Sequence, residues 1–136
     1  MPFPTSNPSI AEALAARGYD EPTPVQAAVG ASDANADLLV SAQTGSGKTV
    51  AFGLAMAATL LGERPRFEQA ATPLAVIIAP TRELALQVHR ELDWLYAKTG
   101  ARVVSCVGGM DPRAERRELA RGAHIVVGTP GRLRDH

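Results

Sequence analysis

Short runs of apolar residues alternate along the chain with longer segments in which apolar residues recur at helical spacing. The runs have the length of strands, and they lie at 38–40, 74–79, 103–107 and 125–127. Helices are expected between and after them, at 48–61, 81–98, 111–121 and from 129 onward. Continuous apolar strands that alternate with helices predict an α/β fold in which a parallel sheet is covered by helices on both faces.

The N-terminal part of the chain has helix signals of its own. Ser9 and Glu12 have the spacing of a capping box, which predicts a short helix that ends at Gly18. Thr23-Pro24 predicts the start of a second helix, because threonine caps a helix and proline suits its first position. We therefore divide the chain into a flank, 1–34, and an incomplete α/β domain, 35–136.

Two further segments can be assigned from the same pattern. The expected helix at 81–98 has an apolar stripe that should face the core, formed by Leu84, Val88, Leu92 and Leu95. The segment 62–73 is polar and contains two prolines, which predicts a surface loop.

Each expected strand runs directly into a short turn. These turns are the glycine-rich segment after 38–40, Pro80-Thr81, Gly108-Gly109 and Thr129-Pro130. Parallel strands place their carboxyl ends at one edge of the sheet, where such sheets bind ligands. All four turns should therefore gather at that edge.

Composition narrows the choice of function without deciding it. The chain has 136 residues, 46% of them apolar, and a formal net charge of zero, so no overall basic charge points to nucleic acid. Cys106 is the only cysteine, and His89, His124 and His136 lack ligand spacing, which leaves no expected metal site beyond the Mg²⁺ of a nucleotide. With no visible secretory signal and no apolar run of bilayer length, a cytoplasmic protein without membrane contact is expected.

The glycine-rich turn has the chemistry of a phosphate-binding loop. It reads Ala42-Gln43-Thr44-Gly45-Ser46-Gly47-Lys48-Thr49, with alanine where the usual pattern has glycine. Gly45 and Gly47 allow backbone N–H groups to point at an anion, Lys48 can neutralise β- and γ-phosphates, and Thr49 can bind Mg²⁺. The alternative is a glycine turn with a solvated lysine. The loop does not choose between a kinase, a transporter ATPase and a helicase.

Gln26 is a candidate for adenine recognition. Its amide has a donor and an acceptor that match N6 and N7 of adenine, and guanine lacks that donor. The alternative is a second capping box in which Gln26 bonds back to Thr23. The two roles are compatible, since the cap can hold the amide in place.

These segments together resemble the motifs of DEAD-box RNA helicases. Gly-Tyr-x-x-Pro-Thr-Pro-Val-Gln from Gly18 is similar to the Q motif, and Ala42–Thr49 is similar to motif I. Pro80-Thr81-Arg82-Glu83-Leu84-Ala85 resembles motif Ia, Gly108-Gly109 the double-glycine motif, and Thr129-Pro130-Gly131-Arg132 motif Ib. The matches follow the family's order and span almost the whole chain.

The resemblance implies a P-loop NTPase domain of the RecA-like type that uses ATP and Mg²⁺. The nucleotide-binding residues it implies are Tyr19, Thr23, Gln26, Ala42, Thr44, Gly45, Ser46, Gly47, Lys48 and Thr49, with Phe3 as a candidate to stack on adenine. Lys48 and Thr49 would also act in catalysis. The residues implied to hold RNA are Pro80, Thr81, Arg82, Gly108, Gly109, Thr129, Pro130, Gly131 and Arg132.

The residues support an RNA-binding edge independently. Thr81 and Thr129 are suited to cap helices whose N–H groups can meet phosphates, and Arg82 and Arg132 supply planar cations. The alternative is that they are caps and turns of an α/β fold, with the arginines in water. Aromatic residues are 4% of the chain, so contacts should be to the backbone of RNA, independent of base sequence and sensitive to salt. The charged stretch 113–121 is expected to be a solvated helix face.

The resemblance also implies what these residues lack. The Asp-Glu-Ala-Asp motif, which supplies acids for hydrolysis, and the second RecA-like domain are not within the 136 residues. We expect the chain alone not to hydrolyse ATP and the parent protein to act as an RNA helicase. An apolar sheet edge is expected to be open. The alternatives are a non-catalytic ATP- or RNA-binding module and a related helicase or translocase acting on DNA.

Overall fold

The computed structural model describes residues 7–19, 21–30, 47–62, 64–69, 71–108 and 111–135. It divides the chain into two compact units, one of 1–66 with 94–99 and the other of 67–93 with 100–136. Several predictions lie outside the described residues: Phe3, the strand at 38–40, the boundary between 34 and 35, and the site residues Ala42, Thr44, Gly45, Ser46 and Gly109.

The first unit is helical. Its helices are α1 (Pro8–Ala16), α2 (Pro24–Gly30) and α3 (Lys48–Leu60), with a short 3₁₀ turn η1 (Ala97–Thr99). Ile10, Leu14 and Leu61 are buried in this unit. Tyr96 is also buried and donates a hydrogen bond from its hydroxyl to the Gly53 carbonyl, 2.6 Å away, which ties the chain segment 94–99 to α3.

The cap of α1 differs from the prediction. Asn7, not Ser9, is the N-cap, and its Oδ1 accepts hydrogen bonds from the backbone N–H groups of Ser9 and Ile10. Asn7 also donates from Nδ2 to the carbonyls of Gly62 and Arg64, at 2.8 and 2.7 Å. The helix starts two residues earlier than expected because Pro8 suits its first position. The expected end at Gly18, where φ is 74°, is confirmed.

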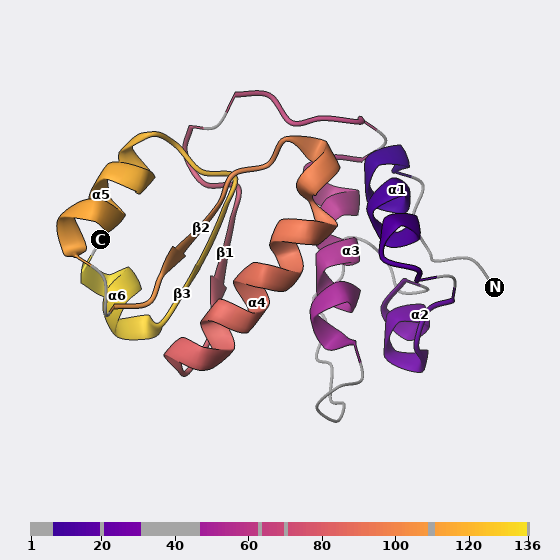
Figure 1. Ribbon diagram of the computed structural model, residues 1–136, viewed down its shortest axis with the longest axis horizontal. Helices are drawn as coiled ribbons and strands as arrows, with labels where there is room; N and C mark the ends of the chain where they lie inside the picture. The colour runs from indigo at the N-terminus through magenta and orange to yellow at the C-terminus, as the bar shows by residue number, and fades with distance from the viewer. Residues whose placement is uncertain are drawn as a thin grey trace. The chain divides into compact units, whose positions relative to one another are not determined.

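The second unit is an α/β structure. Its strands are β1 (Ala75–Ile78), β2 (Val103–Cys106) and β3 (Ile125–Gly128). Its helices are α4 (Arg82–Leu95), whose last two residues belong to the first unit, α5 (Pro112–Ala120) and α6 (Pro130–Asp135). The described strands form one sheet in the order β1-β3-β2, and both pairings are parallel (Figure 1). The predicted α/β class with a parallel sheet is therefore confirmed. The predicted loop at 62–73 contains no helix or strand in its described part.

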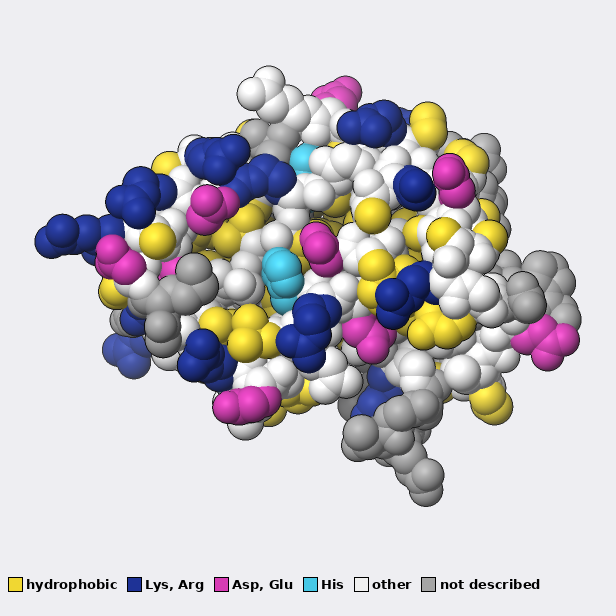
Figure 2. All heavy atoms as spheres, viewed as in Figure 1, with side chains coloured by type: hydrophobic (Ala, Val, Ile, Leu, Met, Phe, Trp, Pro, Cys, Tyr) yellow, Lys and Arg dark blue, Asp and Glu magenta, His cyan; other side chains and the backbone are white. Residues whose placement is uncertain are grey.

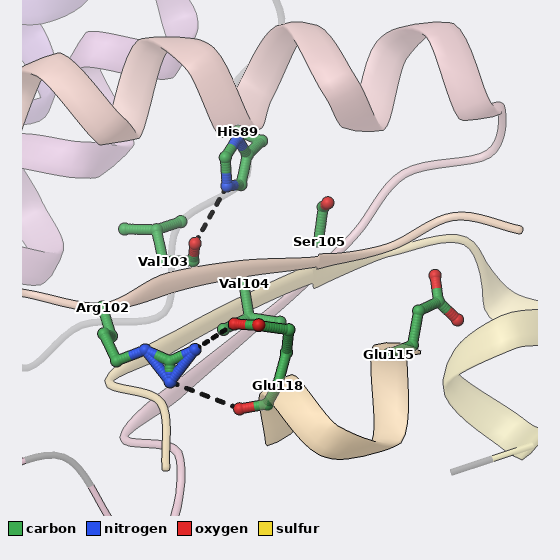
Figure 3. A pocket seen from close by; sticks show the side chains of 7 residues that line it. All are labelled: His89, Arg102, Val103, Val104, Ser105, Glu115 and Glu118. Carbon is green, nitrogen blue, oxygen red and sulfur yellow. Dashed lines mark hydrogen bonds and ion pairs between the residues drawn. The ribbon is translucent and has the colours of Figure 1, made fainter. Parts of the chain in front are cut away.

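Helices pack on the sheet from both sides. On one face, Val104, Cys106 and Val126 form a buried cluster, against which Leu119 of α5 and Leu133 of α6 pack. On the other side of β2 lies α4, whose His89 places Nε2 2.9 Å from the Val103 carbonyl oxygen (Figure 3). β3 is buried along its whole length, as a central strand of such a sheet should be.

Two expectations about apolar positions need correction. The buried stripe of α4 is formed by Ala85, Val88, Leu92 and Leu95, whereas Leu84 is 41% exposed. Consecutive helical residues differ by about 100° in direction, so the stripe continues through Ala85 at helical spacing and leaves Leu84 outside. In β1 burial alternates, and Val76 and Ile78 are 57% and 65% exposed, so this strand is not covered on both faces.

The buried thiol of Cys106 predicts how stability depends on pH. The pKa of Cys106 is raised from 9.0 to about 11. Burial is the main cause and the negative charge of Glu115 is the second, while the positive charge of Arg132 acts in the opposite direction. Between these values the unfolded chain loses its thiol proton while the native chain keeps it, so the free energy of unfolding falls as pH rises. Burial also raises the pKa of Tyr96, but this hydroxyl lowers the free energy of unfolding only above pH 10.0, its ordinary pKa.

Urea unfolding at pH values below and just above 9 measures this slope. We expect Cys106→Ala to be less stable at every pH, because it leaves a cavity. In the lower half of the pH range between 9.0 and about 11, however, its free energy of unfolding should fall much less than that of the wild type. An unchanged decline in the variant would assign the effect to another group.

Candidate functional site

The start of α2 is built on a reciprocal cap. The Oε1 atom of Gln26 accepts a hydrogen bond from the Thr23 N–H at 2.8 Å, and the Gln26 N–H donates to Thr23 Oγ1 at 3.4 Å. Gln26 is 5% exposed, so its amide is held in one place. The predicted capping box is confirmed.

The same amide also reaches the end of the glycine-rich segment. Gln26 Nε2 donates to the Gly47 carbonyl at 3.3 Å, across 21 positions of sequence. Gly47 has φ of 86°, and a Cβ atom built on it would lie 2.3 Å from Gln26 Nε2. Only glycine fits this conformation and this close approach. The candidate adenine reader and the last residue before α3 are therefore in direct contact.

The N-terminus of α3 has the features of an anion-binding end. Gly47 is its N-cap and has no side chain with which to bond the N–H groups of the first turn. Lys48 is exposed and Thr49 is partly exposed at the first two helical positions. The positive end of a 13-residue helix, an ammonium group and a hydroxyl form a donor set that suits a triphosphate with Mg²⁺.

Tyr19 lies against an aromatic residue that sequence reasoning did not connect with it. Its ring centroid is 5.4 Å from that of Trp94, and the guanidinium of Arg17 lies 4.9 Å from the Trp94 ring centroid. Tyr19 is 43% exposed, so one part of its ring remains accessible. Only the three-dimensional structure brings Trp94 next to the segment that follows α1.

In the second unit, three of the four predicted turns leave the sheet at the same level. Ile78 of β1 and Cys106 of β2 both lie opposite Gly128 of β3. Beyond the strands, the Ala79 N–H donates to the Gly128 carbonyl at 2.9 Å, and the Thr129 N–H donates to the Cys106 carbonyl at 3.2 Å. The prediction that the turns gather at one edge is confirmed for these three turns, while residues 42–46 of the fourth turn lie outside the described residues.

The residues of these turns are mostly accessible. Thr81 Oγ1 accepts from the Leu84 N–H at 3.2 Å, as expected of a helix cap. Gly108 has φ of 76°, which favours glycine. The residues with exposed side chains or backbone at this edge are Pro80, Thr81, Arg82, Pro130 and Gly131, while Gly108, Thr129 and Arg132 are partly exposed.

Arg132 is not simply in water. Its Nε donates to Oε1 of Glu115 at 2.7 Å, and its side chain is 20% exposed. Glu115 is 2% exposed and accepts a second hydrogen bond, from the Val107 N–H to Oε2, at 3.1 Å. The expectation that 113–121 is a solvated face is wrong at Glu115. The sequence signal was its spacing of four from Leu119, which places both on the inner side of α5.

The rest of α5 agrees with that expectation. Arg113, Arg116, Arg117 and Glu118 are exposed, and Glu118 pairs with Arg102 and Arg121. The hydrogen bond from Arg102 is the main cause that lowers the pKa of Glu118. Figure 2 shows basic and acidic side chains interleaved on the face that carries α5, which is typical of a solvated surface.

A small cavity of about 190 Å³ lies along β2. It is lined by His89, Arg102, Val103, Val104, Ser105, Glu115 and Glu118 (Figure 3). The described residues contain no group of three His, Cys, Asp or Glu that could hold a metal ion. They also contain no helix with the length and apolar character needed to cross a bilayer.

Comparisons with known proteins give a consistent result. The family model described as DEAD/DEAH box helicase matches residues 23–136. The DEAD-box ATP-dependent RNA helicase CshA of Bacillus licheniformis is 42% identical over 128 residues, which are 93% of this chain and 25% of that protein. A probable ATP-dependent RNA helicase, DDX46 of Homo sapiens, is 44% identical over 127 residues, 93% of this chain and 12% of that protein.

Solved structures agree in fold. The RNA helicase Prp28 from Chaetomium thermophilum, bound to ADP, has a TM-score of 0.81 and 41% identity, over 93% of this chain and 31% of that one. A DEAD box protein from Methanococcus jannaschii has a TM-score of 0.78 and 31% identity, over 96% of this chain and 34% of that one. This chain thus spans a quarter or less of the curated relatives named above. Its fold is that of a truncated RecA-like domain, and the chain belongs to the DEAD/DEAH box helicase family.

Proposed function

We propose that this chain is the ATP-binding and RNA-backbone-binding part of a DEAD-box RNA helicase that uses ATP to unwind or remodel RNA. The observation that carries the nucleotide part is the contact of Gln26 with both Thr23 and Gly47. It joins the candidate adenine reader to the end of the phosphate-binding loop. A relative named as an ATP-dependent RNA helicase and a structural neighbour bound to ADP support the same assignment. The cytoplasm is the proposed compartment.

In this proposal each nucleotide-site residue has a distinct task. The backbone of the loop holds the phosphates, with Ala42, Thr44, Gly45, Ser46 and Gly47 as its members. Lys48 neutralises β- and γ-phosphate charge, and Thr49 offers its hydroxyl to Mg²⁺, which would supply charge neutralisation at the phosphates. Tyr19 and Thr23 flank the base, Thr23 through the cap that fixes Gln26.

Gln26 retains the capacity for adenine despite its internal bonds. An amide oxygen accepts two hydrogen bonds and an amide nitrogen donates two. The contacts to Thr23 and Gly47 use one of each. One acceptor and one donor are left to pair with N6 and N7 of adenine.

The test compares ATP with GTP in titrations of Gln26→Ala. We expect ATP affinity to fall by about tenfold or more while GTP affinity changes much less, since such an amide pair discriminates bases by about 1–3 kcal/mol. Thr23→Ala is the matched control, because it removes Oγ1 from the cap but keeps the backbone N–H that holds the Gln26 amide. It should lower both affinities alike. Equal losses of ATP and GTP affinity in Gln26→Ala would mean that Gln26 acts only as part of the cap.

The proposed RNA-binding edge consists of the turns after β1, β2 and β3. Its residues are Pro80, Thr81, Arg82, Gly108, Gly109, Thr129, Pro130, Gly131 and Arg132. Backbone N–H groups at the starts of α4 and α6 and the cation of Arg82 would meet phosphate oxygens. Arg132, which donates from Nε to Glu115, would add positive charge at the same edge.

Salt dependence tests this part of the proposal. Binding of a single-stranded RNA should weaken steeply with salt, and Arg82→Ala should reduce the slope of log K against log salt by about 0.7, the value for one phosphate contact on a single strand. Arg113→Ala, on the solvated face of α5, is the control and should leave the slope unchanged. A DNA strand of the same sequence that binds as tightly as RNA would favour a DNA-acting translocase instead.

Hydrolysis is proposed for the parent protein and not for these residues alone. Phosphoryl transfer needs a second acid to hold Mg²⁺, a group that orients water and often an arginine finger, beyond what Lys48 and Thr49 provide. The proposal assigns those groups to the Asp-Glu-Ala-Asp motif and to a second RecA-like domain. Phosphate release by this chain with ATP and RNA should equal that of a no-protein control. Turnover clearly above the control would refute the proposal that hydrolysis needs groups beyond these residues.

A further inference from the structure

The carboxylate of Glu115 is the buried charge that the described part of the second unit holds at its motif-bearing edge. It is 2% exposed, although it belongs to a helix whose other charged residues face solvent. Burying a carboxylate is costly unless it is paired and hydrogen-bonded. The groups that bond to the carboxylate therefore indicate which segments it holds in place.

Its two oxygens bond to two different motif-bearing segments. Oε2 accepts from the N–H of Val107, the residue that precedes Gly108. Oε1 accepts from Nε of Arg132, in the first half of α6 and three residues after Thr129. The carboxylate thus joins the turn after β2 to the helix after β3, while β2 and β3 themselves are joined by sheet pairing.

We propose that Glu115 is a positioning residue that fixes the Gly108 turn and α6 relative to one another, so that the backbone groups of both can hold the same RNA strand. This inference rests on the proposed RNA-binding function and adds a residue that none of the family-like motifs contains. Glu115 does not touch RNA in this scheme. It acts through Val107 and Arg132.

A simpler role for Glu115 makes the opposite prediction. If the carboxylate only neutralised Arg132, removing its charge would release a cation at the RNA-binding edge and strengthen RNA binding. If it positions the two segments, the same change weakens RNA binding. Glu115→Gln separates the two roles, because glutamine keeps the shape but has only one acceptor for two N–H donors, and its own NH₂ group would face a donor.

The experiment compares Glu115→Gln with Glu118→Gln in the full chain. Glu118 lies on the same helix and also pairs with arginines, but it is exposed and bonds to neither turn. We expect Glu115→Gln to weaken binding of a single-stranded oligouridylate by about tenfold, the effect of losing one hydrogen bond to a charged group. Glu118→Gln should change it less than twofold. Unchanged or tighter binding in Glu115→Gln would overturn the proposal.

Amide hydrogen exchange gives a readout that does not depend on RNA. In Glu115→Gln the amides of Val107 and Leu133 should exchange faster, while that of Ala85, at the start of α4, should not. Unchanged exchange at both Val107 and Leu133 would overturn the positioning role even if RNA binding fell. A wild-type chain that binds no RNA would instead refute the proposed function, and the exchange rates would still decide whether Glu115 fixes the two segments.

Discussion

Gly47→Ala is expected to eliminate measurable nucleotide binding and to lower the free energy of unfolding by about 3 kcal/mol. Two costs combine at this position. The residue has φ of 86°, where an L-residue other than glycine is strained. Its new Cβ would also lie 2.3 Å from Gln26 Nε2 and 3.1 Å from Thr23 Oγ1. Because Gln26 is 5% exposed and fixed by the cap, its amide cannot swing aside without breaking the contacts that define the site.

Gly62→Ala separates strain from steric conflict. Gly62 also has a positive φ, 61°, but an added Cβ would meet nothing within 4 Å. It should lose only about 1–2 kcal/mol, the cost of the left-handed conformation, and should bind nucleotide normally. Urea unfolding and nucleotide titration of both variants provide the measurement. Equal losses in the two would mean that the approach of Gln26 to Gly47 contributes nothing.

A double variant then identifies the conflict itself. In Gly47→Ala with Gln26→Ala the amide is gone, so the stability lost through the clash should return in part, while the loss from strain should remain. Additive losses of the two substitutions would show that the side chains do not interfere. The comparison therefore tests the coupling between the α2 cap and the start of α3, which no single substitution isolates.

Local signals in the sequence predicted the elements well where one residue decides the outcome. Thr23 caps α2 as expected. Asp111 caps α5, and its carboxylate accepts from the Arg113 N–H at 2.9 Å. The exception is α1, where Asn7 caps the helix in place of Ser9. Ser9 has the capping-box spacing, but Asn7 also bonds to the carbonyls of Gly62 and Arg64, more than 50 positions away. Those long-range bonds cannot be read from a local pattern.

Burial was harder to predict than helix or strand. The stripe of α4 passes through Ala85, a small residue with a weak apolar signal, and bypasses Leu84. Glu115 was assigned to solvent because charged residues surround it, yet its position on α5 turns it toward Val107 and Arg132. A carboxylate is buried only when its partners are brought to it, and here the partners come from a strand end and another helix.

The location of the site was more accessible from sequence than its contacts. Parallel pairing brings the ends of β1, β2 and β3 together. The shared edge of Pro80, Gly108 and Thr129 therefore followed from the prediction of parallel strands alone. The contact of Gln26 with Gly47 did not follow, because it depends on how α2 packs against α3. Motifs thus pointed to the candidate residues, and packing determines what holds them.

Gly128→Ala is the second substitution for which a large effect is expected. Gly128 ends β3, directly before Thr129, and an added Cβ would lie 2.6 Å from the Cys106 carbonyl oxygen and 2.8 Å from Leu133 Cγ. The first of these atoms belongs to the backbone of the neighbouring strand and cannot rotate away. We expect the free energy of unfolding to fall by about 2–3 kcal/mol, the cost of overpacking a well-packed core. Because the same Cys106 carbonyl accepts from the Thr129 N–H, RNA binding should weaken as well.

Gly131→Ala is the matched control, three residues further along. Gly131 is exposed on α6 and an added Cβ there meets nothing within 4 Å, so alanine should leave stability unchanged or raise it by about 0.5–1 kcal/mol through helix propensity. If RNA lies close to the backbone at this turn, Gly131→Ala still weakens RNA binding, and it does so without unfolding the protein. A different outcome is that only Gly128→Ala loses RNA affinity, while Gly131→Ala matches the wild type in stability and in RNA binding. The RNA would then lie away from the first turn of α6, and the sheet edge would still be needed to support its binding site. Similar stability in the two variants would contradict the packing argument, since only Gly128 has a backbone oxygen within reach of the new methyl group.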